Sequence, residues 1–172
     1  FRSIIYQKAP FVMRQLERLV GADAFREGLR EYLTQYAFGN ASWPDLVTLL
    51  DRRTPLDLAA WSRAWVSEPG RPRIEADVRD AGGTIARLTI RQSDPSGRSL
   101  LWPQRLRVDA GTSAGIAHWD VTLTGAETVV PDATGRATPE WILPSGGGLG
   151  YGDFVLDARS LGTSVLRVMP SV

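Results

Sequence analysis

The segment Tyr6-Gln7-Lys8-Ala9-Pro10 holds the residues best placed to do chemistry. Proline is tolerated in a helix only within the first turn, where backbone N–H groups have no partner in the helix. Pro10 therefore predicts that regular helix begins no earlier than about residue 7. Tyr6 is expected at the N-terminus of that helix, where the backbone dipole is positive and a phenol can donate to developing negative charge, as in oxyanion stabilisation. A tyrosine packed at the edge of a core explains the same local pattern, and this pattern alone favours that structural explanation.

Two further candidates favour structural explanations. His118, the only histidine, alternates along an expected strand with apolar residues that should face the core, so it is expected on the solvated side. The segment Gly146–Gly152 has the glycine density of a phosphate-binding loop, but a strand follows it and no lysine accompanies it. An ordinary loop is expected there.

Surface charge and tryptophan content also fit structural roles. Glu27 and Glu31 share one face of an expected helix with Arg26 and Arg30 beside them, which is typical of a solvated surface. The 6 Trp residues fit helix and sandwich cores better than a ligand-stacking site.

The apolar spacing of the first half predicts four helices. The first helix carries one apolar stripe and ends at Gly21; its members are Ile5, Ala9, Val12, Leu16 and Leu19. A second helix is expected after Asp23 as its N-cap, ending at Gly39-Asn40. A third begins with a capping box from Ser42 to Asp45, and a short fourth follows Thr54-Pro55.

The second half changes period. Pro69-Gly70-Arg71-Pro72 breaks the last helix and is the best domain boundary in the chain. Beyond it, six or seven short segments of alternating polarity are separated by Gly, Pro, Asp and Ser, with no helical pattern between them. The expected fold class is α+β, with an N-terminal helical subdomain of about four helices followed by an antiparallel β-sandwich.

A set of short motifs occurs in one order along the chain: Ile5-Tyr6-Gln7-Lys8, Gln15-Leu16-Glu17, Ala24–Leu33, Phe38-Gly39-Asn40-Ala41, Asp45-Leu46, Trp61, Trp65 and Pro69–Pro72. This succession resembles the aminopeptidase N family of zinc metallopeptidases (gluzincins), in the segment just after the metal-binding helices. The resemblance covers residues 4–78 in detail. The later strands, with Ile142-Leu143-Pro144 and Gly150-Tyr151-Gly152, resemble the sandwich domain that follows there.

The resemblance implies that Tyr6 is catalytic. In the family, a tyrosine at this position donates a hydrogen bond to the oxyanion of the tetrahedral intermediate, while zinc polarises the peptide carbonyl and a Glu activates water. The zinc signature, His-Glu-x-x-His with a more distal Glu, is absent from this sequence, which has 1 His and no Cys. Zinc is therefore expected in the full-length parent, no cofactor in the chain alone, and the isolated chain is expected to be inactive. Ala9 stands where the family usually has Gly, and Ser145–Gly148 replaces a more polar loop.

The resemblance also implies a domain organisation. Residues 1–70 are expected to be the C-terminal helical part of the catalytic domain, residues 71–160 the β-sandwich domain, and residues 161–172 the sandwich end or a linker. The first residue is not Met and lies within an apolar pattern, so an excised fragment is expected. The expected partners are a peptide substrate, a missing N-terminal catalytic part and a C-terminal helical domain.

Composition narrows the classes of binding partner and the compartments to consider. The chain has 20 Lys+Arg against 19 Asp+Glu, so it gives no support to nucleic-acid or membrane-surface binding. No apolar run approaches the length of a membrane span, and a cysteine-free chain is compatible with the cytoplasm. A second hypothesis remains open: a non-catalytic helical and β-sandwich module that binds a protein or glycan. A zinc signature upstream of Phe1 would favour a fragment of a zinc aminopeptidase over this binding module.

Overall fold

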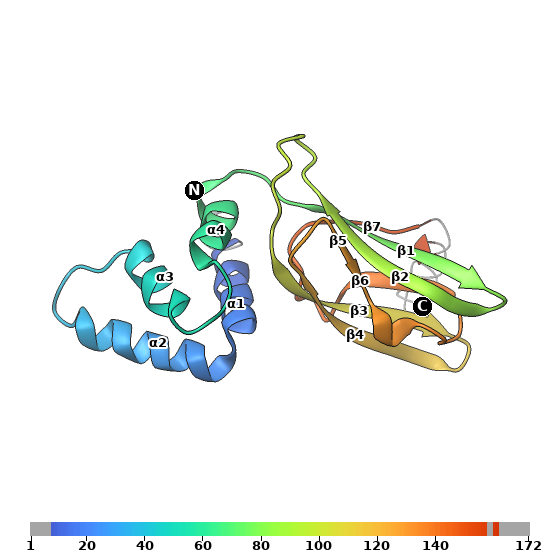
Figure 1. The fold of residues 1–172 in the computed structure, drawn as a ribbon, viewed down its shortest axis with the longest axis horizontal. Helices are drawn as coiled ribbons and strands as arrows, with labels where there is room; N and C mark the ends of the chain where they lie inside the picture. Colours follow the sequence, from blue (N-terminus) through green and yellow to red (C-terminus); the bar gives the residue numbers. More distant parts are fainter. Residues whose placement is uncertain (1–7, 158–159, 162–172) are drawn as a thin grey trace, which may run out of the picture. The chain divides into compact units, whose positions relative to one another are not determined.

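The computed structural model describes residues 8–157 and 160–161, and the chain divides into two compact units, Phe1–Pro69 and Gly70–Val172 (Figure 1). The first unit is helical and the second is built from strands. This confirms the predicted α+β class. Of the expected end segment, residues 161–172, only Leu161 lies within the described residues.

A single glycine joins the first two helices. Helix α1 (Ala9–Val20) ends at Gly21, whose N–H donates to the carbonyl of Glu17 at 2.8 Å, and α2 (Ala22–Gln35) starts at the next residue. Gly21 has φ 96° and ψ 143°, a conformation that strongly favours glycine. The predicted N-cap Asp23 is wrong, because Gly21 already caps α2 and places Asp23 in its first turn. The predicted end at Gly39-Asn40 is also too late.

The predicted capping box of the third helix is confirmed. Helix α3 (Trp43–Asp51) follows Ser42, whose backbone N–H and hydroxyl both donate to the carboxylate of Asp45, at 2.8 and 2.6 Å. Both hydrogen bonds hold the pKa of Asp45 below its usual value, and the bond from the hydroxyl has the larger effect. The carboxylate is thus kept charged where the helix dipole favours it.

The last helical segment follows Thr54-Pro55, as predicted. Helix α4 (Leu58–Ser62) is capped by Asp57, whose carboxylate accepts from the N–H of Ala60 at 2.7 Å, and it continues into a π-helical turn, Arg63–Ser67. Three apolar residues of this segment are buried and include a stacked pair of indole rings 5.5 Å apart, those of Trp61 and Trp65; the third is Leu58.

The β unit contains seven strands within the described residues: β1 (Arg73–Ala81), β2 (Thr84–Ser93), β3 (Gln104–Thr112), β4 (Gly115–Leu123), β5 (Glu127–Val129), β6 (Trp141–Gly146) and β7 (Asp153–Val155). They form two sheets, ordered β5-β2-β1-β7 and β4-β3-β6 (Figure 1). The facing sides of the two sheets share one apolar core. The predicted sandwich is confirmed.

One strand pair departs from the antiparallel pattern. Strand β7 runs parallel to β1, with Phe154 opposite Ile74, whereas the other strand pairs within the two sheets are antiparallel. A tight turn at Gly82-Gly83 joins β1 to β2, and both glycines have positive φ. A parallel pair needs a long connection, and the chain from β1 to β7 passes through the other five strands.

Candidate functional site

Tyr6 lies outside the described residues, which begin at Lys8. The structure nevertheless defines the helix that follows it. Pro10 occupies the first turn of α1, which starts at Ala9. The prediction that regular helix begins no earlier than about residue 7 concerns residues before Lys8, which lie outside the described residues. Tyr6 precedes Ala9, the first residue of α1, by three positions in the sequence.

Lys8 is the first described residue and the N-cap of α1. Its side chain is half-buried, and this burial lowers the pKa of the Lys8 ammonium group, because desolvation disfavours the charged form. The chain therefore enters α1 through surroundings partly screened from water. Electrostatic interactions are stronger in such surroundings than in bulk solvent.

The buried face of helix α1 differs from the apolar stripe predicted for it. Val12 and Leu16 are buried as expected, but Ala9 is exposed and Leu19 is only half-buried. Gln15, which directly precedes Leu16 in the sequence, is fully buried. The buried face is therefore rotated toward Gln15, which the sequence reasoning missed because a polar residue gives no signal in an apolar pattern.

A polar cluster fixes the end of α2 against the start of α3. The rings of Tyr32 and Tyr36 lie 5.3 Å apart, and Tyr32 donates weakly to the carbonyl of Ser42 at 3.4 Å. Burial and a hydrogen bond to the Asp45 carboxylate raise the pKa of the Tyr36 phenol. This cluster uses its tyrosines as structural links.

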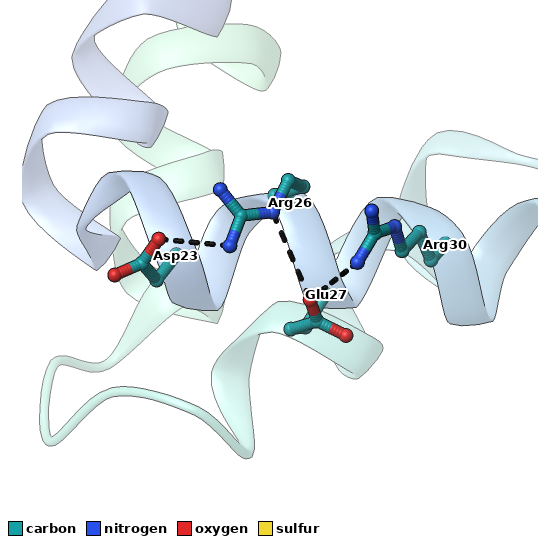
Figure 2. Close-up of polar contacts among 4 residues, drawn as sticks. All are labelled: Asp23, Arg26, Glu27 and Arg30. Atoms are coloured by element: carbon teal, nitrogen blue, oxygen red, sulfur yellow. Dashed lines mark hydrogen bonds and ion pairs between the residues drawn. The ribbon is translucent and has the colours of Figure 1, made fainter.

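The charged face of α2 is a solvated ion-pair network, as predicted (Figure 2). Arg26 lies 2.9 Å from Asp23, and Arg30 donates to Glu27 at 2.8 Å. Glu31 differs from the prediction, because it pairs with Arg53, which follows α3. Arg53 also donates to the carbonyl of Leu49, so this pair links two helices.

The other two candidates, His118 and the glycine-rich segment Gly146–Gly152, lie in the β unit. His118 is exposed on β4, opposite Asp109 of β3, as the alternation predicted. The glycine-rich segment is the end of β6 followed by a turn through Gly147 and Gly148, both at positive φ, and strand β7 comes next. Residues 8–157 and 160–161 contain no group of three or more His, Cys, Asp or Glu that could hold a metal ion.

Helix length gives no sign of a membrane segment. Within the described ranges, every helix is too short or too polar to cross a bilayer.

Comparisons with known proteins place the helical unit in a family. Residues 1–65 match the model of the peptidase family M1 domain. The chain is 33% identical to aminopeptidase N of Streptomyces lividans over 94% of its own length, and 32% identical to aminopeptidase N of Lactobacillus helveticus over 63%. It is 30% identical to the tricorn protease-interacting factor F2 of Thermoplasma volcanium over 63% of its length.

The relatives are much longer than this chain. It spans 20% of the Streptomyces protein, 13% of the Lactobacillus protein and 14% of the Thermoplasma protein. The Streptomyces match covers nearly all of the chain, whereas the M1 domain model ends within the helical unit. The ordered motifs and these matches agree, and the chain belongs to peptidase family M1.

Proposed function

We propose that this chain is part of a zinc aminopeptidase that hydrolyses N-terminal residues from peptides, and that Tyr6 is its oxyanion-binding residue. The observation that carries the proposal is the match of residues 1–65 to the M1 peptidase domain. Two of the relatives named above are aminopeptidases N. In this proposal the helical unit completes a catalytic domain, and the sandwich joins that domain to a further helical domain.

The role of Tyr6 rests on its place before α1. Pro10 fixes the start of the helix, and the buried face of α1 anchors it against the rest of the unit. A tyrosine phenol ordinarily has a pKa of about 10, so it is protonated at neutral pH and can donate to a developing oxyanion. A donor of this kind acts mainly in the transition state, because the negative charge is greatest there.

Zinc does not fit the residues described. They contain no metal-binding group, and the whole sequence has one histidine and no cysteine. The proposal therefore assigns the zinc ligands to the rest of the parent protein and gives this chain no part in holding the metal. The cytoplasm is the proposed compartment, since a chain without cysteine needs no oxidising environment.

The test is the kinetics of Tyr6→Phe in the full-length parent, expressed from the gene that encodes this chain. We expect kcat for an aminoacyl arylamide to fall by about 10²- to 10³-fold, with KM nearly unchanged and zinc content intact. Tyr32→Phe is the matched control, because it keeps the ring and removes a hydroxyl that donates only weakly, to the carbonyl of Ser42. Its kcat should stay close to that of the unmodified parent.

Other outcomes have distinct meanings. A normal kcat in Tyr6→Phe removes Tyr6 from the mechanism, and loss of zinc or of folding identifies a structural tyrosine. A folded parent without peptidase activity overturns the enzymatic proposal and favours the non-catalytic binding module.

A further inference from the structure

Strand β4 is an outer strand of the sandwich. In the sheet order β4-β3-β6 it pairs with β3 on one side, and no strand of the described residues is hydrogen-bonded to its other side (Figure 1). Its nine residues pair with β3 without a register shift. A long, regular edge of this kind presents a row of backbone donors and acceptors to another strand.

The side chains of β4 divide cleanly between two faces. Val121 and Leu123 are buried in the sandwich core. The opposite face carries four exposed residues, Ile116, His118, Asp120 and Thr122. The side chain of Ile116 is 62% exposed, although it is large and apolar. A second strand lying beside β4 would cover part of this apolar surface.

The neighbouring edge of the other sheet adds to this surface. Strand β5 is also an outer strand, and a hollow between β4 and β5 is lined by residues 118–122 and 128–132. Val129 of β5 is 39% exposed. The two sheet edges therefore lie on one side of the sandwich, and both leave an apolar side chain in solvent.

The order of charges along β4 selects one partner and one register. In an antiparallel pair, directly opposed residues lie on the same face, so two copies of one strand pair about a central residue. With Trp119 at the centre, His118 of each copy lies opposite Asp120 of the other, and Ile116 lies opposite Thr122. Centring on His118 opposes two histidines, and centring on Asp120 opposes two carboxylates. Among these three registers, only the one centred on Trp119 pairs a histidine with a carboxylate and opposes no two titratable side chains of the same kind.

We propose that β4 pairs antiparallel with β4 of a second copy of this chain, centred on Trp119, to form one continuous sheet across a two-fold dimer. The contact contains two His118–Asp120 pairs on its outer face. Within each copy, His118 faces Asp109 and Asp120 faces Arg107 on β3, and Arg107 donates to Asp109 at 2.7 Å. Asp132 also lines the hollow beside this edge. The charges alternate across β3 and β4, and the second copy continues the alternation.

The association is tested by sedimentation velocity of the chain at about 10 to 200 μM. We expect a dimer whose dissociation constant rises about tenfold or more in Asp120→Lys, because the substitution places two lysines opposite two histidines. Glu140→Lys makes the same charge change at an exposed position away from the β4 edge and should leave the constant unchanged. A monomer at the highest concentration, or equal effects of the two substitutions, overturns the proposal.

The register has a separate test that does not depend on Asp120→Lys folding. The chain has no cysteine, so His118→Cys and Asp120→Cys each introduce a single thiol. Under mild oxidation, a mixture of the two variants should form a heterodimeric disulfide, because directly opposed strand residues are within bonding range. Each variant alone should stay uncrosslinked. Crosslinking of either variant with itself, or none in the mixture, contradicts a contact centred on Trp119.

Discussion

Gly111 of β3 lies directly against the indole ring of Trp141 on β6, its neighbour in the sheet. A methyl group at this glycine would overlap atoms of the ring. Trp141 therefore has its position because residue 111 has no side chain, and the pair fixes how closely β3 and β6 pack near the end of the sandwich.

Replacing this glycine should destabilise the β unit. Gly111→Ala is expected to lower the free energy of unfolding by about 1–3 kcal/mol, because the ring or the strand must move to admit the methyl group. Urea denaturation followed by tryptophan fluorescence measures the change. At Gly125 a new Cβ would have its nearest contact at 3.8 Å, with the carbonyl of Glu127, so Gly125→Ala is the matched control and should change little. Equal midpoints for the two variants would contradict the steric argument.

The capping box should contribute measurably to the helical unit. Ser42→Ala removes the hydroxyl that donates to Asp45, and a loss of about 1 kcal/mol is expected for an N-cap of this type. Far-UV circular dichroism during chemical denaturation reports the helices. Ser67→Ala, at an exposed serine near the end of the helical unit, is the control. A control that loses as much stability as Ser42→Ala would argue against the cap.

The same box predicts an acid-dependent stability. The pKa of Asp45 is lower in the folded chain than its ordinary value, because Ser42 donates to the charged carboxylate. Asp45 therefore adds stability above its unfolded-state pKa of about 3.9, and this stability is lost as the pH falls through the lower folded-state value. Asp45→Asn should show a smaller loss of helical stability between about pH 5 and pH 2.5. If helical stability depended on pH in the same way in Asp45→Asn and in the unmodified chain, this contribution would be ruled out.

The isolated chain should hold no stoichiometric zinc. One histidine and no cysteine cannot build the family's zinc signature. After dialysis against zinc-containing buffer and then metal-free buffer, elemental analysis should find far less than one equivalent, and an aminoacyl reporter should not be cleaved above background. The full-length parent, treated identically, is the positive control. One retained equivalent in the isolated chain would show an unrecognised metal site.

Local patterns predicted most of the helices and strands, and they failed where tertiary contacts decide. Ser42 and Asp45 could be read from spacing, because both partners of a capping box lie within one turn. The start of α2 could not be read from spacing, since Gly21 caps both α1 and α2 and makes the plausible cap Asp23 unnecessary. The parallel position of β7 depends on a pairing with β1 far away in the sequence, which no local signal encodes.

The candidate site shows the same division. Pro10 indicated a helix N-terminus nearby, and it does lie in the first turn of α1, because its missing N–H is a local constraint. The burial of Gln15 could not be predicted, since a polar residue gives no signal in an apolar pattern. The role of Tyr6 came from the resemblance rather than from its own pattern. It remains a prediction, because Tyr6 lies outside the described residues.

The glycine that joins α1 and α2 also bears on proteolysis. Gly21 donates to Glu17 and accepts from the N–H of Phe25 at 2.9 Å, so the helical hydrogen bonds continue on both sides of it. Proteases cut most readily at exposed loop tips, and this junction contains no such loop. The exposed residues 37–41 between α2 and α3 do provide one. Native cleavage of the described helices should therefore begin in that loop, leaving α1 and α2 in a single fragment.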